Sequence, residues 1–108
     1  MTRKSENRFT CDVLVIGSGA AGLTAAVTAA HYGLKVMVAE KAAVFGGTSA
    51  WSGGWLWIPR NPLARAAGID EAASEPMRYL RSEIGNRVSD PRVQAFLENG
   101  PDMVGFLV

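Results

Sequence analysis

The stretch DVLVIGSGAAG, residues 12–22, decides the fold predicted for this chain. Residues 12–16 are mostly apolar and do not alternate with polar ones, which predicts a strand buried on both faces of a parallel sheet. Gly17 ends this strand, and an alanine-rich stretch then predicts a helix from Ala20 to about Tyr32. Gly33 stands where the end of a helix commonly requires a positive φ.

A second apolar strand is predicted at residues 36–39, directly before Glu40 and Lys41. A strand, a helix and a second strand within about 30 residues form a βαβ unit, which we place at residues 11–41. The predicted fold class is therefore α/β, a Rossmann-like doubly wound FAD/NAD(P)-binding fold. Two strands are few for such a sheet, so we expect the chain to be the N-terminal part of a longer protein.

The glycines of this stretch are spaced as G-x-G-x-x-G between a strand and a helix, which predicts dinucleotide binding. Gly17 permits the tight turn, Gly19 lets the backbone approach a pyrophosphate, and Gly22 lets the helix pack closely on the strand. The amino end of the helix offers N–H donors and a positive dipole end to the phosphates. Glu40 would accept hydrogen bonds from the adenosine ribose hydroxyls. The alternative is a glycine-rich turn that binds no ligand.

Residues 45–62 read FGGTSAWSGGWLWIPRNP and predict a Gly/Trp-rich loop, with a short strand at residues 55–58. Its two Gly-Gly pairs flank small hydroxyl residues, which offer N–H and O–H groups to a second phosphate and to a planar ring. This favours FAD over NAD alone. An NAD-binding reductase domain and a loop that is glycine-rich only for its turns remain the alternatives. Trp51, Trp55 and Trp57 fit either a flat apolar pocket or a core.

Helical signals fill residues 70–108. Asp70 and Ser74 are candidate helix caps, and an apolar stripe follows them. A second helix is predicted to begin near residue 90, and Gly100-Pro101 is predicted to interrupt the chain. Residues 1–10 are polar and are expected to form a flexible lead.

Composition excludes several classes of protein. A net charge of +1 argues against a nucleic-acid-binding protein. The single cysteine, Cys11, excludes an intrachain disulfide, leaves too few thiols for a zinc or iron–sulfur site, and favours the cytoplasm. Residues 13–34 carry no charged side chain, but their glycines and alanines argue against a membrane span. His31 is interpreted as a residue at the end of the first helix, with no catalytic role.

The stretches DVLVIGSGAAGLTAA, AEK and FGGTSAWSGGWLWIP together resemble the N-terminal FAD-binding segment of the fumarate reductase/succinate dehydrogenase flavoprotein superfamily. Within it, the 3-ketosteroid dehydrogenase branch is the most similar, and YLRSEIGNRVSDPRVQAFLENGPDMVGFL is similar to the same branch. The resemblance implies an FAD-dependent oxidoreductase that passes hydride between a small apolar substrate, such as a 3-ketosteroid, and the flavin. The family's proton-transferring tyrosines have no counterpart in this chain, so no catalytic residue is assigned and the chain alone is expected to be inactive.

The resemblance also implies which residues contact FAD. The covalent flavin histidine of some members has no clear match, so FAD is expected to be bound non-covalently. The pyrophosphate is implied to contact Gly17, Gly19, Ala20 and Ala21, and the adenosine ribose is implied to contact Glu40, with Lys41 beside it. The phosphates and the ribityl chain are implied to continue along Gly46, Gly47, Thr48 and Ser49. The isoalloxazine ring is implied to face Ser52, Gly53 and Gly54. A degenerate product that binds no cofactor is the competing interpretation.

Overall fold

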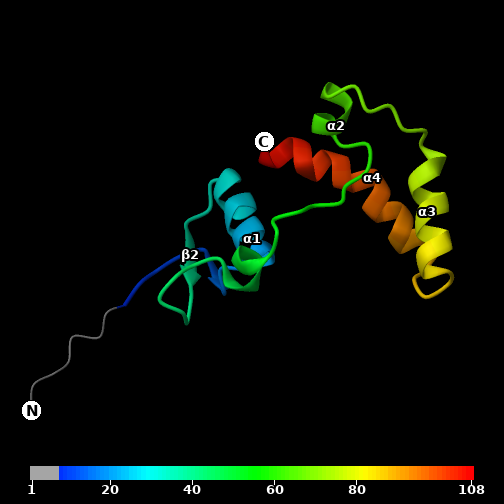
Figure 1. The fold of residues 1–108 in the computed structure, drawn as a ribbon. Coiled ribbons are helices and arrows are strands. Elements are labelled where there is room, and N and C mark those ends of the chain that lie inside the picture. Colours follow the sequence, from blue (N-terminus) through cyan, green and yellow to red (C-terminus); the bar gives the residue numbers. More distant parts are fainter. Residues whose placement is uncertain (1–7) are drawn as a thin grey trace, which may run out of the picture. The chain divides into compact units, whose positions relative to one another are not determined.

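The computed structural model describes residues 8–108, so most of the predicted flexible lead at 1–10 lies outside the described residues. The chain divides into two compact units, and the division falls between Trp55 and Leu56. Unit 1 ends at Trp55, and unit 2 runs from Leu56 to Val108. In Figure 1 unit 1 carries the strands and α1, and unit 2 carries α2, α3 and α4.

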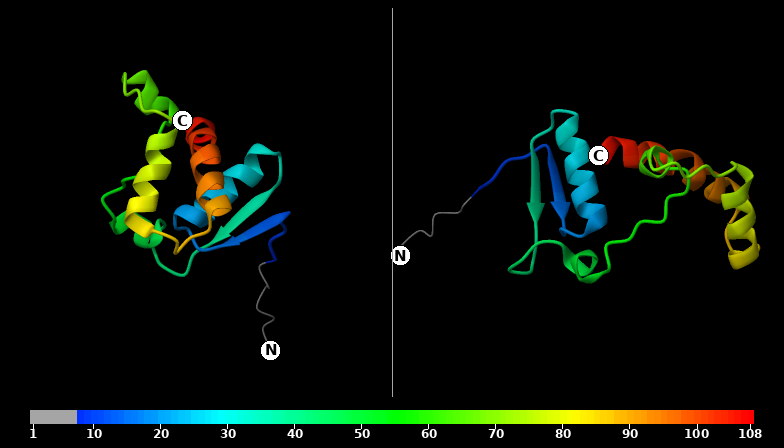
Figure 2. Two further views of the ribbon diagram at one scale, coloured as in Figure 1. Left: turned by 90° about the vertical axis from the view of Figure 1, so that its right-hand side faces the viewer. Right: turned by 45° about the horizontal axis from the view of Figure 1, so that its top comes forward.

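Unit 1 is a strand–helix–strand unit made of β1 (Val13–Ile16), α1 (Ala20–His31) and β2 (Val36–Ala39). The two strands pair in parallel along their whole length (Figure 2). These elements lie within one residue of the predicted ones, so the predicted order and its α/β character are confirmed. The positive φ predicted for Gly33 is also confirmed, at 82°. Its N–H donates to the Ala30 carbonyl at 2.9 Å and so closes the end of α1.

Among the described residues of unit 1, a helix covers one face of the sheet only, which differs from the predicted burial on both faces. α1 packs against both strands, and Val15 of β1 and Ala26 of α1 are buried. Leu14 and Ile16, whose side chains alternate with that of Val15, are 55% and 76% exposed. The apolar sequence of β1 is thus typical of a strand buried on both faces, whereas unit 1 supplies a helix on one face of the sheet only.

Unit 2 is helical and consists of α2 (Pro62–Ala66), α3 (Ser74–Ile84) and α4 (Asp90–Leu107). The helix α2 was not predicted, although Asn61 caps it by accepting a hydrogen bond from the Ala64 N–H at 3.0 Å. The strand predicted at residues 55–58 is wrong, because this segment is extended without a pairing partner among the described residues. Ser74 is the first residue of α3 and not its cap, and Asp70 lies before the helix.

The predicted interruption at Gly100-Pro101 is also wrong, because α4 continues through both residues. A proline inside a helix costs about 3 kcal/mol, since it removes one hydrogen bond and crowds the preceding turn. Packing offsets this cost: Val93, Gly100 and Val104 form a buried stripe along α4. A Cβ added to Gly100 would lie 2.9 Å from Ile58 Cγ2, so this glycine lets Ile58 approach the helix.

The tryptophans behave differently from one another. Trp57 of unit 2 stacks on Phe96 at a centroid distance of 6.2 Å and contacts Tyr79 at 5.5 Å, but it is 49% exposed and so belongs to an aromatic cluster at the surface of the unit, not to its buried core. Trp51 and Trp55 of unit 1 are exposed. Over residues 8–108, no helix combines the length and the apolar character that crossing a membrane would require.

Candidate functional site

The glycine turn that joins β1 to α1 has the geometry its spacing predicts. Gly17 adopts a φ of 95°, a conformation that favours glycine. A Cβ added to Gly22 would lie 2.2 Å from the Gly17 carbonyl oxygen and 3.3 Å from Val15 Cγ1. Only a residue without a side chain allows the first turn of α1 to lie this close to β1.

The start of α1 is accessible from the side of Gly19. This residue precedes the helix in an extended conformation, and a Cβ added to it would meet only Ser49 Oγ, at 3.8 Å. The N–H of Ala20 donates to Ser49 Oγ at 3.1 Å. The first turn carries no acidic side chain, so its N–H groups and the positive end of the helix dipole favour an anion.

The second glycine-rich segment folds back onto this turn. The N–H of Gly46 lies 3.1 Å from the Ser18 carbonyl oxygen and 3.0 Å from Ser18 Oγ, and donates to both. A Cβ added to Gly47 would lie 3.4 Å from the Gly19 Cα. Residues 47–51, expected to be irregular, form the short 3-10 helix η1 (Gly47–Trp51). The structure therefore brings together two segments that the sequence separates by more than twenty residues.

Glu40 follows β2 and points its carboxylate at the glycine turn. Its Oε2 accepts hydrogen bonds from the Ser18 hydroxyl and, at 3.0 Å, from the Ser18 N–H. Its Oε1 accepts from the Ala42 N–H at 2.9 Å. These hydrogen bonds lower the pKa of Glu40 from 4.5 to about 2. The largest effect comes from the Ser18 hydroxyl, followed by the backbone N–H groups of Ala42 and Ser18 and, most weakly, of Lys41. Desolvation of the carboxylate raises the pKa by a smaller amount. The carboxylate is therefore charged at neutral pH.

This pKa predicts how the stability of unit 1 depends on pH. Because folding lowers the pKa of Glu40, its charge stabilises the folded state above about pH 4.5, and the contribution is lost as the pH falls toward 2. We expect the free energy of unfolding to fall less steeply from about pH 5 to pH 3 in Glu40→Gln than in the unchanged chain. Urea unfolding followed by circular dichroism measures this difference. As a control, Glu83→Gln changes an exposed carboxylate of α3, and its free energy of unfolding should fall with pH as steeply as that of the unchanged chain. If the free energy of unfolding fell equally steeply in Glu40→Gln and in the unchanged chain, the prediction would be contradicted.

The remaining predicted residues lie in the same unit, at its surface. Lys41 and Thr48 are exposed. Ser52 donates its hydroxyl to the Ser49 carbonyl at 2.7 Å and accepts from the Gly54 N–H at 3.2 Å, so it holds the turn after η1. A Cβ added to Gly53 would lie 3.0 Å from Trp55 Cδ1. A hollow of about 550 Å³ borders this segment and is lined partly by Gly47 and Thr48.

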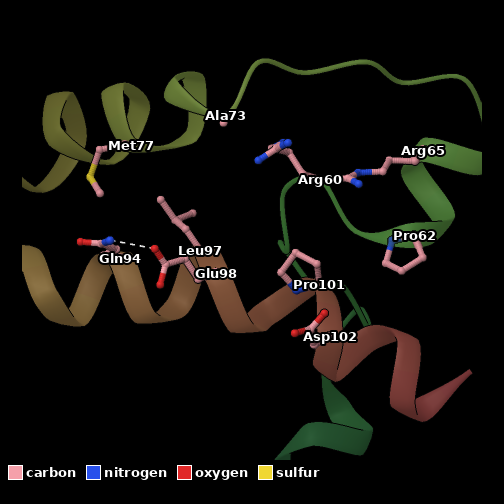
Figure 3. A pocket seen from close by; sticks show the side chains of 10 residues that line it. All are labelled: Arg60, Pro62, Arg65, Ala73, Met77, Gln94, Leu97, Glu98, Pro101 and Asp102. Carbon is pink, nitrogen blue, oxygen red and sulfur yellow. Dashed lines mark hydrogen bonds between the residues drawn. The ribbon is translucent and has the colours of Figure 1, made fainter.

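A cavity of about 790 Å³ lies elsewhere, in unit 2 (Figure 3). Arg60, Met77 and Leu97 are among its lining residues, and Gln94 donates to Glu98 across one turn of α4 at 2.7 Å. None of the residues predicted to contact FAD lines it. Among residues 8–108 there is also no group of three or more His, Cys, Asp or Glu side chains placed to hold a metal ion.

Sequence reasoning missed one residue of this site, Ser18. It occupies a position that the G-x-G-x-x-G pattern leaves undefined, yet its side chain is bonded to Glu40 and to Gly46. One signal was available: Ser18 and Glu40 each follow one of two parallel strands, and the carboxyl ends of such strands meet at one edge of the sheet.

A parallel strand–helix–strand unit, a glycine turn open at the helix start and a carboxylate after the second strand are the features of a dinucleotide-binding protein. The family model described as an FAD binding domain matches residues 12–108. The chain belongs to this family, and FAD is its cofactor.

Curated relatives and a solved structure agree with this family. The chain is 44% identical over 97 residues to a 3-oxosteroid 1-dehydrogenase of Mycolicibacterium smegmatis, covering 90% of this chain and 17% of the relative. It is 47% identical over 100 residues to a 4-oxocyclohexanecarboxylate 2-dehydrogenase of Sinomonas cyclohexanicum, covering 93% and 17%. The structure of a 3-ketosteroid Δ1-dehydrogenase from Sterolibacterium denitrificans superposes with a TM-score of 0.77 at 41% identity, covering 90% and 17%.

These matches confirm the resemblance to 3-ketosteroid dehydrogenases and the choice of FAD. The relatives are dehydrogenases, which confirms the predicted class of oxidoreductase for the family. The chain spans about 17% of the length of these relatives.

Proposed function

We propose that unit 1 binds FAD non-covalently, as part of a Rossmann-like fold in a flavin-dependent oxidoreductase. The convergence of the open start of α1, the Gly46–Gly47 segment and the Glu40 carboxylate at one edge of the sheet supports this proposal. Gly19, which meets no side chain closer than Ser49 Oγ at 3.8 Å, and a first turn of α1 without acidic side chains fit a pyrophosphate, and the charged Glu40 carboxylate fits ribose hydroxyls. The flavin, when bound, supplies the redox chemistry by accepting or donating hydride.

The residues divide the binding of FAD among them. The backbone at Gly17, Gly19, Ala20 and Ala21 binds the pyrophosphate, and Glu40 with Lys41 beside it orients the adenosine ribose. The second glycine segment, with Thr48 and Ser49, binds along the phosphates and the ribityl chain. We place the isoalloxazine ring against the following turn, made of Ser52, Gly53 and Gly54.

For the whole protein we propose a small apolar substrate that carries a ring ketone, such as a 3-ketosteroid. The names of the relatives support the ring ketone, since both an oxosteroid and an oxocyclohexanecarboxylate carry a carbonyl group on a ring, and the oxosteroid supports the apolar character. The cytoplasm is the proposed compartment, because the single thiol of Cys11 fits a reducing environment.

The absorbance spectrum of the chain after incubation with FAD and gel filtration tests the proposed cofactor site. We expect flavin absorbance to elute with the protein, and no nicotinamide absorbance after the same treatment with NADH. Circular dichroism of the same fraction reports whether the chain is folded. A folded but colourless protein would contradict the proposed phosphate and ribose contacts.

A further inference from the structure

Ser18 is a buried polar residue to which the proposed contacts with FAD assign no role. It is 2% exposed, although it lies in a turn between a strand and a helix. Its hydroxyl donates to Glu40 Oε2 and accepts from the Gly46 N–H at 3.0 Å. Its backbone N–H also donates to Glu40 Oε2, and its carbonyl oxygen also accepts from the Gly46 N–H. One residue is thus bonded twice to each of two segments that the proposed function places on the cofactor.

The hydrogen bonds at Glu40 limit what its carboxylate can still accept. Each carboxylate oxygen has about two acceptor positions. The two donors of Ser18 occupy both positions of Oε2, and the Ala42 N–H occupies one position of Oε1. The remaining capacity for a ligand hydroxyl therefore lies on Oε1.

We propose that Ser18 is a positioning residue for the adenosine ribose: it holds Oε2 of Glu40 so that Oε1 accepts one ribose hydroxyl, and it fixes Gly46 beside the phosphate turn. This inference rests on the proposed binding of FAD. Ser18 does not touch the ribose in this arrangement and acts through Glu40. Without its hydroxyl, Oε2 gains a free position and both ribose hydroxyls can compete for the carboxylate.

The affinity of the full chain for FAD and for two analogues, lacking the 2′- or the 3′-hydroxyl of the adenosine ribose, tests the inference. Isothermal titration gives the three dissociation constants. In the unchanged chain we expect one analogue to bind roughly tenfold more weakly or worse, and the other to bind like FAD, because one hydrogen bond to a charged group is lost. In Ser18→Ala this difference between the analogues should shrink to within about twofold, and FAD itself should bind about tenfold more weakly.

A second measurement needs no cofactor. The Glu40 carboxyl carbon, followed by NMR, should titrate near pH 2 in the unchanged chain and closer to 4.5 in Ser18→Ala. Ser82→Ala, which removes an exposed hydroxyl that donates to the Tyr79 carbonyl within α3, should change neither the dissociation constants nor the titration.

The outcomes separate this inference from the proposed function. If Glu40→Gln binds FAD as the unchanged chain does, the ribose contact is wrong and the inference falls with it. If Glu40→Gln weakens binding while Ser18→Ala changes neither affinity nor titration, only the role of Ser18 is overturned. Equal losses for the two analogues in the unchanged chain would also overturn it, whether or not Ser18→Ala folds.

Discussion

Replacing Gly22 with alanine should destabilise unit 1 by about 3 kcal/mol or more. The new methyl group would lie 2.2 Å from the Gly17 carbonyl oxygen, and the obstacle is backbone that no rotamer change can move aside. Either α1 shifts away from β1 or the glycine turn distorts. Urea unfolding followed by far-ultraviolet circular dichroism measures the loss, and FAD retention should fall with it.

Gly105→Ala is the matched control for this change, since it is also a glycine inside a helix. There a Cβ would make an ordinary contact with Pro62 Cγ at 3.7 Å. Alanine at this position of α4 should raise the free energy of unfolding by about 0.5 kcal/mol through its higher helix propensity. If Gly22→Ala were as stable as the unchanged chain, the close packing of α1 on β1 would be wrong.

Replacing Gly19 with alanine should leave the fold intact and remove binding of FAD. Gly19 has a φ of −71°, which alanine adopts without strain, and the added methyl group meets nothing closer than Ser49 Oγ at 3.8 Å. Because Gly19 is the N-cap of α1, where glycine is preferred over alanine, the free energy of unfolding should fall by about 1 kcal/mol at most. The methyl group would, however, stand where the pyrophosphate approaches the backbone, so we expect affinity for FAD to fall on the order of 100-fold.

Flavin fluorescence titration and urea unfolding of the same Gly19→Ala sample check both halves of this prediction. Gly105→Ala, outside the proposed site, should bind FAD like the unchanged chain. Normal affinity in a folded Gly19→Ala would place the pyrophosphate elsewhere. The two substitutions, at Gly22 and at Gly19, thus separate a glycine required for packing from one required for binding.

The sequence predicted unit 1 well because its signals are local. An apolar run, a glycine turn, an alanine-rich helix and Gly33 each act within a few residues, and β1, α1 and β2 formed within one residue of their predicted bounds, whereas η1 was not predicted. The segment 55–58 failed for the opposite reason. Its aromatic and β-branched residues favour a strand only where a neighbouring strand accepts the pairing, and none of the described strands does so.

Unit 2 shows tertiary packing overriding a local signal. Gly100-Pro101 is a strong breaker in isolation, yet Ile58 packs against Gly100 and the helix continues. The capping of α2 by Asn61, in contrast, could have been predicted from the Asn61-Pro62 pair, since asparagine followed by proline is typical of a helix start. The bonds of Ser18 connect residues 22 and 28 positions apart, and no spacing rule within one segment predicts such contacts.

The hydroxyl of Ser49, which accepts the Ala20 N–H, acts as an internal competitor for any phosphate at the start of α1. A bound phosphate that takes this N–H has to displace the hydroxyl, which is tethered to the same chain and is present at every cofactor concentration. The amide is therefore satisfied both with and without ligand. What it adds to affinity is only the difference between a charge-assisted bond to phosphate and a neutral bond to serine.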